Sequence, residues 1–502
     1  MTMRWVVLAG FLVSLGFAPV HAFSAYVVGF GIFMAILREN GRSLRAAVSI
    51  ITIFTFFFLL SSFYWVVFSL SVDWKKYWPL AAPVLIGVPV LFGWIYGGVT
   101  LLWWRYCRNL QASEVILGIL WWCAELFKEY IFIGFPWNIP ADVWTSTPNG
   151  ILYLSAYIGA SGLNLLTLVG AMWLGRCLRY GLAGWHICAL VVGAMMYLWV
   201  PCAKQPVRKN TVVLVQPSIH QSIKGSPMHV HDLLTEMRLY SSNPTPDPHA
   251  TIIWAEGALP LAVKVSYPYG GSNTTTPGLE AYFSSITQGK NTLFATGITY
   301  HEEKSVRKIF NSMIHVDAHG KIVTKVSKAR LLPFGEYLPF RRFFPQLFAD
   351  LAVGPLDMSP DFSPSLLYAD GLTWHILVCF ESLFSDLARR YLEADVLVIV
   401  TNDAWFGHSP GPYQHLSAAI LRAVETGIPV LRVANNGISA VIDGAGHRHA
   451  QLGINAKGAI HAYIPQAMPK TFFWRFPWVG VVLMVCALIV AIGIANSRDR
   501  RV

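Results

Sequence analysis

Charged residues are scarce in this chain of 502 residues: 13% are Asp, Glu, Lys or Arg, while 54% are hydrophobic. Soluble domains carry about a quarter charged residues, so this composition argues against an ordinary soluble protein and indicates a membrane protein. The apolar excess lies before about residue 202 and after about residue 473. The stretch between has a globular composition and is long enough to bury its own core.

Acidic residues are also few, 27 against 38 Lys and Arg, which gives a formal net charge of +11. Many of the basic residues lie in short loops between apolar runs, as residues that orient membrane helices do. This placement favours orientation and attraction to anionic lipid. It argues against a nucleic-acid partner.

The globular stretch contains a single cysteine, Cys379, out of seven in the chain. Five others lie in or beside apolar runs, and Cys202 lies at the membrane edge; the five are Cys107, Cys123, Cys177, Cys188 and Cys486. The globular stretch therefore has no disulfide framework. It also lacks a cluster of metal-ligand residues, and we expect neither a metal nor an organic cofactor.

Long apolar runs are what the chain has in abundance. A helical span needs about 20 residues, and the first two of the runs are short. The runs lie near 5–20, 24–37, 47–70, 80–104, 112–130, 151–176, 183–201 and 475–495.

Arginines between these runs predict the orientation of the chain. If every run crosses the membrane, one side holds Arg4, Arg38, Arg42, Arg45, Arg105, Arg108, Arg176, Arg179, Arg498, Arg500 and Arg501. The positive-inside rule makes that side cytoplasmic and places 203–473 on the opposite, periplasmic face. Residues 1–22 also resemble a cleavable signal peptide. Its removal would leave the later topology unchanged.

The globular stretch has the pattern of an α/β fold. Short runs rich in β-branched residues suit strands that are buried on both faces of a layered sheet. Helix-like segments follow at 383–393 and 413–427. The predicted strands are 211–215, 251–254, 293–297, 374–379 and 396–401.

Three polar side chains follow or end strand-like segments, where α/β folds place reactive groups. Glu256 offers a partly desolvated carboxylate that suits a general base. Lys328 offers an ammonium that can stabilise an oxyanion. Cys379 precedes a predicted helix whose N–H groups would stabilise a thiolate. Each residue alone also has a purely structural interpretation, as an exposed Glu, a solvated basic turn and a small buried hydrophobe.

The order Glu, Lys, Cys, together with several longer motifs, resembles the nitrilase superfamily of carbon–nitrogen hydrolases. The resemblance to its membrane-embedded branch, the apolipoprotein N-acyltransferase family, is close and covers essentially the whole chain. Tyr64-Trp65-Val66 and Gly134-Phe135-Pro136-Trp137 match in the membrane part. The motifs of the globular part are Pro333-Phe334-Gly335-Glu336, Thr401-Asn402-Asp403-Ala404-Trp405-Phe406-Gly407 with Gly411-Pro412 and Gln414-His415, and Leu431-Arg432-Val433-Ala434-Asn435-Asn436-Gly437.

This resemblance implies a polytopic α-helical membrane domain joined to a nitrilase-like αββα sandwich. We expect about seven transmembrane helices in 1–202, the periplasmic catalytic domain in 203–473, and a last transmembrane helix with a cytoplasmic tail in 474–502.

By position, the resemblance makes Glu256 the general base, Lys328 the stabiliser of the tetrahedral intermediate and Cys379 the nucleophile. Supporting residues are Glu336, Glu381 and Phe380. Candidates for substrate binding are Phe343, Phe344, Phe348 and Trp405. The first three lie in segment 337–365, which we expect to gate lipid entry.

The implied reaction is a ping-pong N-acyl transfer in a bacterial inner membrane, catalysed by a monomer. The donor is a phospholipid, in this family the sn-1 chain of phosphatidylethanolamine, and the acceptor is a diacylglyceryl apolipoprotein. Two alternatives remain. A membrane-anchored amidase or nitrilase would share the triad but would not require so many spans. A transporter or receptor would place more ionisable residues inside its spans than Glu125 and Lys128.

Overall fold

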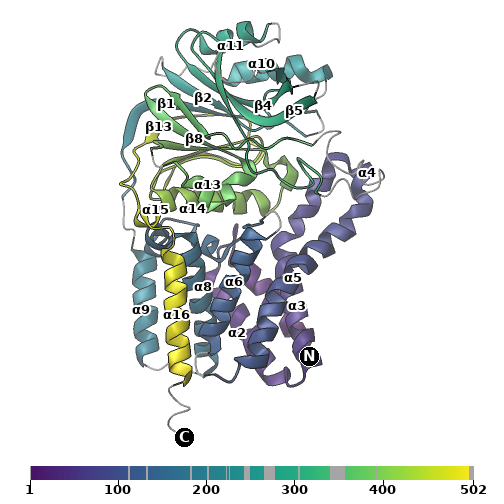
Figure 1. Cartoon of the computed structure of the whole chain (residues 1–502), viewed down its shortest axis with the longest axis vertical. Helices are drawn as coiled ribbons and strands as arrows, with labels where there is room; N and C mark the ends of the chain where they lie inside the picture. Colours follow the sequence, from purple (N-terminus) through teal and green to yellow (C-terminus); the bar gives the residue numbers. More distant parts are fainter. Residues whose placement is uncertain are drawn as a thin grey trace.

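The computed structural model describes residues 2–110, 113–131, 134–180, 184–199, 203–221, 223–224, 227–241, 249–264, 278–303, 306–339, 357–391 and 393–496. A bundle of helices forms one end of the molecule, and two stacked sheets with their covering helices form the other (Figure 1). The N-terminus lies at the far end of the bundle, and the last helix runs from the sheets toward that end.

Each of the eight predicted apolar runs coincides with a helix. Short elements between them include the 3-10 helix η1 (Tyr64–Asp73) and helix α4 (Trp74–Tyr77), and helix α15 (Phe472–Arg475) precedes the last one. The eight are α1 (Thr2–Ser14), α2 (Phe23–Asn40), α3 (Leu44–Phe63), α5 (Ala81–Tyr106), α6 (Ser113–Tyr130), α8 (Ser155–Tyr180), α9 (Gly184–Leu198) and α16 (Val479–Asn496).

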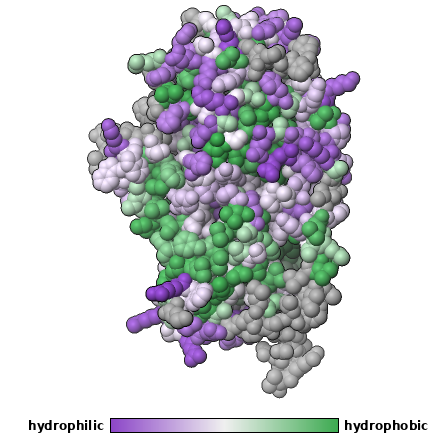
Figure 2. Space-filling view, turned by 180° about the vertical axis from the view of Figure 1, so that it is seen from behind, coloured by the Kyte–Doolittle hydropathy of each residue, from purple (hydrophilic) through white to green (hydrophobic). Residues whose placement is uncertain are grey.

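The helical half has a surface suited to lipid. Among the described residues, the stretches long and apolar enough to cross a membrane are Leu44–Ser71, Trp74–Tyr106 and Ser155–Cys177, and two shorter apolar helices are Thr2–Ser14 and Val479–Val490. Figure 2 shows a hydrophobic band over this half, with hydrophilic residues above it and at the bottom. Exposed apolar side chains include Phe11, Val48, Ile86, Trp94, Leu102, Val482 and Ile489. The chain is therefore a membrane protein.

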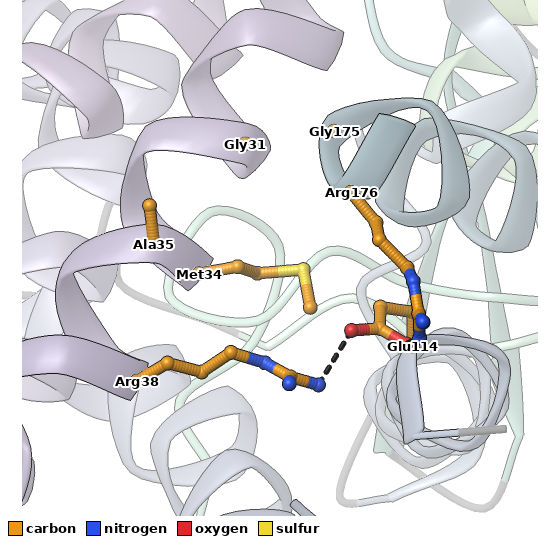
Figure 3. Close-up of a pocket in the computed structure, with 7 residues that line it drawn as sticks. All are labelled: Gly31, Met34, Ala35, Arg38, Glu114, Gly175 and Arg176. Carbon is orange, nitrogen blue, oxygen red and sulfur yellow. Dashed lines mark hydrogen bonds and ion pairs between the residues drawn. The ribbon is translucent and has the colours of Figure 1, made fainter. Parts of the chain in front are cut away.

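Charged side chains join three helices of the bundle (Figure 3). The Glu114 carboxylate, at the start of α6, accepts a hydrogen bond from Arg38 of α2 and a second one, across 2.8 Å, from Arg176 of α8. Helices α2 and α8 pack closely there: a Cβ added to Gly31 would lie 3.1 Å from Gly175 Cα. The arginines at the ends of α2 and α8 thus lie at one level, as the positive-inside pattern predicts.

Two sheets form the other half. The first has the order β13-β1-β2-β4-β5-β6, with β3 paired to β4, and the second has the order β12-β11-β10-β9-β8-β7. The strands are β1 (Val207–Gln216), β2 (Ala250–Trp254), β3 (Val263–Lys264), β4 (Thr292–Glu303), β5 (Val306–Val316), β6 (Ile322–Ser327), β7 (Leu366–Ala369), β8 (Leu372–Val378), β9 (Val396–Thr401), β10 (Val430–Ala434), β11 (Ser439–Ile442), β12 (Arg448–Leu452) and β13 (Gly458–Pro465).

Alternating side chains of the strands fill three separate layers. In β9, Val396, Val398 and Val400 point between the sheets, while Leu397 and Ile399 pack on the helical side. Helices α10 (Val230–Ser241) and α11 (Leu279–Thr287) cover the outer face of the first sheet, and α14 (Gly411–Thr426) covers the second (Figure 1). The result is the predicted nitrilase-like αββα sandwich. Its helix α14 shares one continuous core with the bundle.

A glutamine of α14 joins the two halves. The Gln414 side-chain oxygen accepts hydrogen bonds from the indole nitrogens of Trp65, across 3.0 Å, and Trp137, across 2.9 Å. Its side-chain nitrogen donates to the Ser62 carbonyl oxygen. Motifs far apart in the sequence therefore meet at the contact between the bundle and the sandwich.

Candidate active site

Cys379 lies directly after strand β8, in a strained turn. Its φ is +53°, a left-handed conformation that side chains other than glycine rarely adopt, and the residue is 7% exposed. The prediction of a helix after Cys379 was wrong in detail. A 3-10 helix of five residues, Cys379–Leu383, follows, and the α-helix Ser385–Ala388 has only four residues.

Glu256 lies in the turn after strand β2 and is 8% exposed. Its Oε1 accepts a hydrogen bond from the side-chain nitrogen of Asn311 in β5, across 2.7 Å. Its Oε2 is buried and has no hydrogen-bond partner among the described residues. One carboxylate oxygen is therefore held in place while the other is available to take a proton.

Lys328 follows strand β6, and its amine forms an ion pair with the Glu336 carboxylate across 2.8 Å. Burial lowers the pKa of Lys328, but the carboxylates of Glu336 and Glu256 outweigh this effect, so the pKa is raised overall. Asn311 also donates to Glu336 Oε1, across 2.9 Å. The lysine is therefore a permanent cation. The side-chain amide of Asn311 connects its partner, Glu336, to Glu256.

Glu381 ties the turn of Cys379 to the loop of Lys328. Its Oε1 accepts hydrogen bonds from the backbone N–H groups of Ala329 (2.8 Å) and Arg330 (3.0 Å), and its Oε2 accepts one from Val378 (2.9 Å). Burial raises the pKa of this carboxyl group, although the three backbone donors oppose the shift. The side chain fixes the two loops relative to each other.

The charges around Cys379 leave it a thiol in the resting protein. Burial raises its pKa and the Glu256 carboxylate adds to this, while Lys328 and the hydroxyl of Thr401 lower it. Lys224, whose amine donates to the Glu256 carbonyl oxygen across 3.0 Å, has its pKa lowered to about 8 by burial, against the pull of Glu256 and Cys379. Deprotonation of the thiol therefore needs a base beside it.

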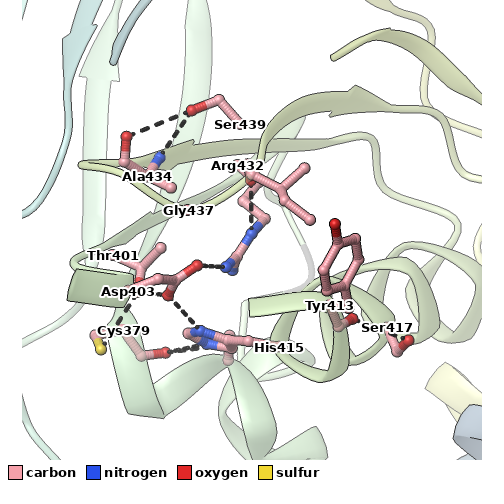
Figure 4. A network of polar contacts seen from close by, with 12 residues as sticks. Cys379, Thr401, Asp403, Tyr413, His415, Ser417, Arg432, Ala434, Gly437 and Ser439 are labelled. Carbon is pink, nitrogen blue, oxygen red and sulfur yellow. Dashed lines mark hydrogen bonds and ion pairs between the residues drawn. The ribbon is translucent and has the colours of Figure 1, made fainter. Parts of the chain in front are cut away.

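A buried polar network lies on the other side of Cys379 (Figure 4). Thr401 ends β9, and its hydroxyl lies 3.4 Å from Cys379 Sγ and 2.9 Å from Asp403 Oδ1. Asp403 also accepts a hydrogen bond from Arg432 across 2.6 Å, and His415 Nδ1 lies 3.0 Å from its Oδ1. The four residues of this network, Thr401, Asp403, His415 and Arg432, are at most 1% exposed.

The structure brings the three predicted catalytic residues, Glu256, Lys328 and Cys379, into one buried cluster, together with Glu336 and Glu381. Their roles in catalysis stay predictions. The ring of Phe380 packs against Phe384 with centroids 5.1 Å apart, facing the helical side rather than the thiol cluster. Trp405 is half-buried in the 3-10 helix Asp403–Phe406. Phe343, Phe344 and Phe348, and with them most of the proposed gating segment 337–365, lie outside the described residues.

Several site residues were not predicted from the sequence, namely Asn311, Lys224, Thr401 and Asp403. Asn311 gives no local signal, because it lies in the middle of β5 and points to the site only through strand pairing. Thr401 and Asp403 stand in a recognised motif at a strand end, and that position could have identified them. Within the described part of the chain, no group of three or more His, Cys, Asp or Glu side chains is placed to hold a metal ion.

Sequence comparisons match both halves of the chain. The carbon–nitrogen hydrolase family matches residues 234–470, and the apolipoprotein N-acyltransferase N-terminal domain matches residues 9–173. Among solved structures, Saccharomyces cerevisiae Nit3, a member of branch 10 of the nitrilase superfamily, is 17% identical and covers 51% of this chain and 90% of its own, with a TM-score of 0.39.

Relatives cover the chain from end to end. The apolipoprotein N-acyltransferase of Allorhizobium ampelinum is 30% identical and spans 97% of this chain and 95% of its own. The apolipoprotein N-acyltransferase of Brucella melitensis is 30% identical and spans 98% of this chain and 96% of its own. That of Rickettsia prowazekii is 28% identical over 96% of both chains. With both halves matched and 30% identity maintained over nearly the full length of each protein, this chain belongs to the apolipoprotein N-acyltransferase family.

Proposed function

We propose that this protein moves an acyl chain from a membrane phospholipid to the α-amino group of a diacylglyceryl-cysteine apolipoprotein, through a thioester on Cys379. The observation that carries the proposal is the buried cluster of a thiol, a permanent cation and a carboxylate, one oxygen of which has no hydrogen-bond partner among the described residues. Family membership supports lipoprotein N-acylation. The identity of the donor and the covalent route are our proposal.

In the first half-reaction the thiol becomes a thioester. Glu256 Oε2 takes the proton of the Cys379 thiol, and the sulfur attacks the ester carbonyl carbon, in this family the sn-1 ester of phosphatidylethanolamine. The Lys328 ammonium stabilises the negative charge that develops on the carbonyl oxygen. The acyl–oxygen bond then breaks, and Glu256 returns the proton to the departing lysophospholipid oxygen.

In the second half-reaction the thioester is consumed. The neutral α-amino group of the diacylglyceryl-cysteine attacks the thioester carbonyl carbon, and Glu256 accepts a proton from the nitrogen. The carbon–sulfur bond breaks, the amide forms, and the proton on Glu256 returns to the Cys379 sulfur. The enzyme is restored, and no external oxidant, reductant or metal takes part in any of these steps.

The membrane half suits two lipid-anchored substrates. Both substrates stay in one leaflet, so an embedded enzyme meets them by lateral diffusion and holds the reactive carbonyl near headgroup depth. We propose a bacterial inner membrane with the sandwich, 203–473, in the periplasm, because the arginine-rich helix ends lie away from the sheets. Residues 1–202 and 474–502 would form the membrane domain.

The test is the acyl-enzyme itself. The purified full-length protein in detergent micelles is incubated with phosphatidylethanolamine, and the peptide that contains Cys379 is examined by mass spectrometry. We expect the peptide to gain the mass of one acyl chain, and we expect a diacylated lipopeptide to remove that mass and to become triacylated.

The matched controls are two cysteine variants. Cys379→Ala should lose the adduct, while Cys123→Ala, which removes an exposed cysteine of the bundle, should keep it. Folded protein that forms no adduct with phospholipid would overturn the proposal. An adduct formed only from small amides, with release of ammonia, would favour the amidase alternative instead.

A further inference from the structure

The polar network behind Cys379 has no part in the mechanism proposed above, although it contacts the reacting sulfur. Thr401 Oγ1 lies 3.4 Å from Cys379 Sγ, within hydrogen-bond distance for sulfur. The hydroxyl is fully buried, so water does not compete for it. A fully buried hydroxyl in contact with a nucleophile needs an explanation of its own.

The Thr401 hydroxyl has two acceptors but a single hydrogen. The second acceptor, Asp403 Oδ1, lies 2.9 Å from Thr401 Oγ1. Burial alone raises the pKa of Asp403, but Arg432 and His415 overcome this and lower it to about 2. Asp403 is therefore an ionised carboxylate that can only accept hydrogen bonds. While Cys379 is a neutral thiol, the hydrogen of Thr401 points to Asp403, and the oxygen of Thr401 can accept the S–H.

Asp403 is itself firmly held. Arg432 donates to Oδ2 across 2.6 Å, and the same arginine donates to the Ile438 carbonyl oxygen across 3.0 Å. His415 lies between Asp403 and the nucleophile turn, with Nδ1 3.0 Å from Oδ1 and Nε2 3.3 Å from the Cys379 carbonyl oxygen. These contacts remain when the hydrogen of Thr401 turns away, so Asp403 can release it without being left unpaired.

We propose that the Thr401 hydroxyl stabilises the Cys379 thiolate by turning its hydrogen from Asp403 to the sulfur, with Asp403 as the competing acceptor that keeps the resting residue a thiol. The proposal rests on Cys379 being the nucleophile. The proton of the thiol still passes to Glu256, and Thr401 keeps its own hydrogen throughout, so only the direction of one hydrogen bond changes. Thr401 thus contributes to catalysis through direct contact with the reacting atom.

Other charges act on the same sulfur and stay constant in the test. They are Glu256 after β2, Lys328 after β6 and Lys224 in the loop after β1. Since Thr401→Val and Thr401→Ser leave all of these charges in place, any difference between the two variants reports the hydroxyl. Thr287→Val provides the matched control, because it removes another fully buried hydroxyl, which donates to the Ala318 carbonyl oxygen in a different part of the sandwich.

The experiment measures the reactivity of Cys379 without any lipid substrate. The full-length protein in micelles is alkylated with iodoacetamide between pH 6 and 10, and the rate at the Cys379 peptide is followed by mass spectrometry. We expect Thr401→Val to slow alkylation about tenfold at each pH in this range, as a rise of about one unit in the pKa of the thiol would. Thr401→Ser and Thr287→Val should overlay the wild type.

A second variant moves the profile the other way. Asp403→Asn removes the competing carboxylate and its negative charge, so alkylation should become faster rather than slower. A residue that only supported the fold would not give opposite shifts for Thr401→Val and Asp403→Asn. If Thr401→Val does not fold, Asp403→Asn alone still tests the proposal, because slower or unchanged alkylation of this variant would contradict Asp403 as the competing acceptor.

The two proposals fail in different ways. Equal alkylation rates for the wild type and Thr401→Val would overturn the role of Thr401, and so would slower alkylation of Asp403→Asn. Neither result would count against the proposed acyl transfer. The expected shifts together with no acyl adduct on folded wild-type protein would instead overturn the proposed function and retain the role of Thr401.

Discussion

Asn311 donates a hydrogen bond to Glu256 Oε1 across 2.7 Å, from the middle of strand β5 to the turn after β2. The same nitrogen donates to Glu336 across 2.9 Å. One amide therefore sets the distance between the proposed general base and the partner of Lys328. Because it binds Oε1, Oε2 is the oxygen of Glu256 that has no hydrogen-bond partner among the described residues.

Asn311→Ala should slow formation of the acyl-enzyme by about tenfold to a hundredfold, since hydrogen bonds to charged groups contribute about 1.5–3 kcal/mol. Asn311→Asp should be slower still, because it sets a third carboxylate beside Glu256 and Glu336. The burst of acylated Cys379 peptide measures both rates. Rates within twofold of the wild type for Asn311→Ala would show that the amide does not orient the base.

Glu381→Gln should loosen the nucleophile turn. A carboxylate can accept from all three N–H groups, whereas the amide nitrogen of Gln faces at least one of them as a second donor. An unsatisfied buried donor costs about 1–3 kcal/mol, so we expect a lower Tm in detergent and at least tenfold slower acylation. Glu393→Gln, at an exposed position, is the control. An unchanged Tm for Glu381→Gln would contradict the bridging role of its carboxylate.

Glu114→Gln should destabilise the bundle where α2, α6 and α8 meet (Figure 3). It leaves Arg38 and Arg176 facing each other without the anion that holds them, and loss of such contacts typically costs about 1.5–3 kcal/mol. We expect a lower Tm in detergent and unchanged alkylation of Cys379. Glu393→Gln, which removes an exposed carboxylate of the sandwich, should keep the wild-type Tm. Equal Tm values for the two variants would argue against a stabilising ion cluster.

Acid should destabilise the sandwich through its buried histidines. Burial, with help from Arg390, lowers the pKa of His375 to about 3, and the pKa values of His415 and His315 are also lowered. The unfolded chain binds a proton near pH 6.5 that the folded chain excludes. Stability is therefore fully present above pH 6.5 and falls as the pH drops below it, in the case of His375 down to about pH 3, by up to about 1.4 kcal/mol per pH unit for each group.

His375→Phe should flatten this dependence, and His319→Gln, at an exposed turn, should not. Thermal unfolding in detergent between pH 4 and 8 measures both. A wild-type Tm that stays constant over this range would contradict the prediction that these histidines are buried in the neutral form.

The strands that carry Glu256 and Cys379 could be predicted because each is a short β-branched run buried on both faces. The eight apolar helices could be predicted because lipid requires long apolar segments. Both are local properties of the sequence. The family resemblance then supplied the αββα sandwich and the order of the three catalytic candidates.

The partners of those residues could not be predicted. Asn311 reaches Glu256 only because β5 pairs with β4 and β4 with β2, so the contact depends on the register of three strands. The helix expected after Cys379 fails for a related reason. Glu381 turns back to accept from Val378 and from the loop of Lys328, and these nonlocal contacts favour a tight 3-10 turn over a longer helix.

Gly437 lies against the network that holds Asp403. A Cβ added at this position would lie 2.0 Å from Asp403 Oδ2, so no larger residue fits while the carboxylate occupies its place beside Arg432. We therefore expect the two positions to vary together among homologous chains. A homologous chain that carries any other residue at the position of Gly437 should also have replaced the aspartate, and such double replacements would mark proteins whose nucleophile is tuned by other means.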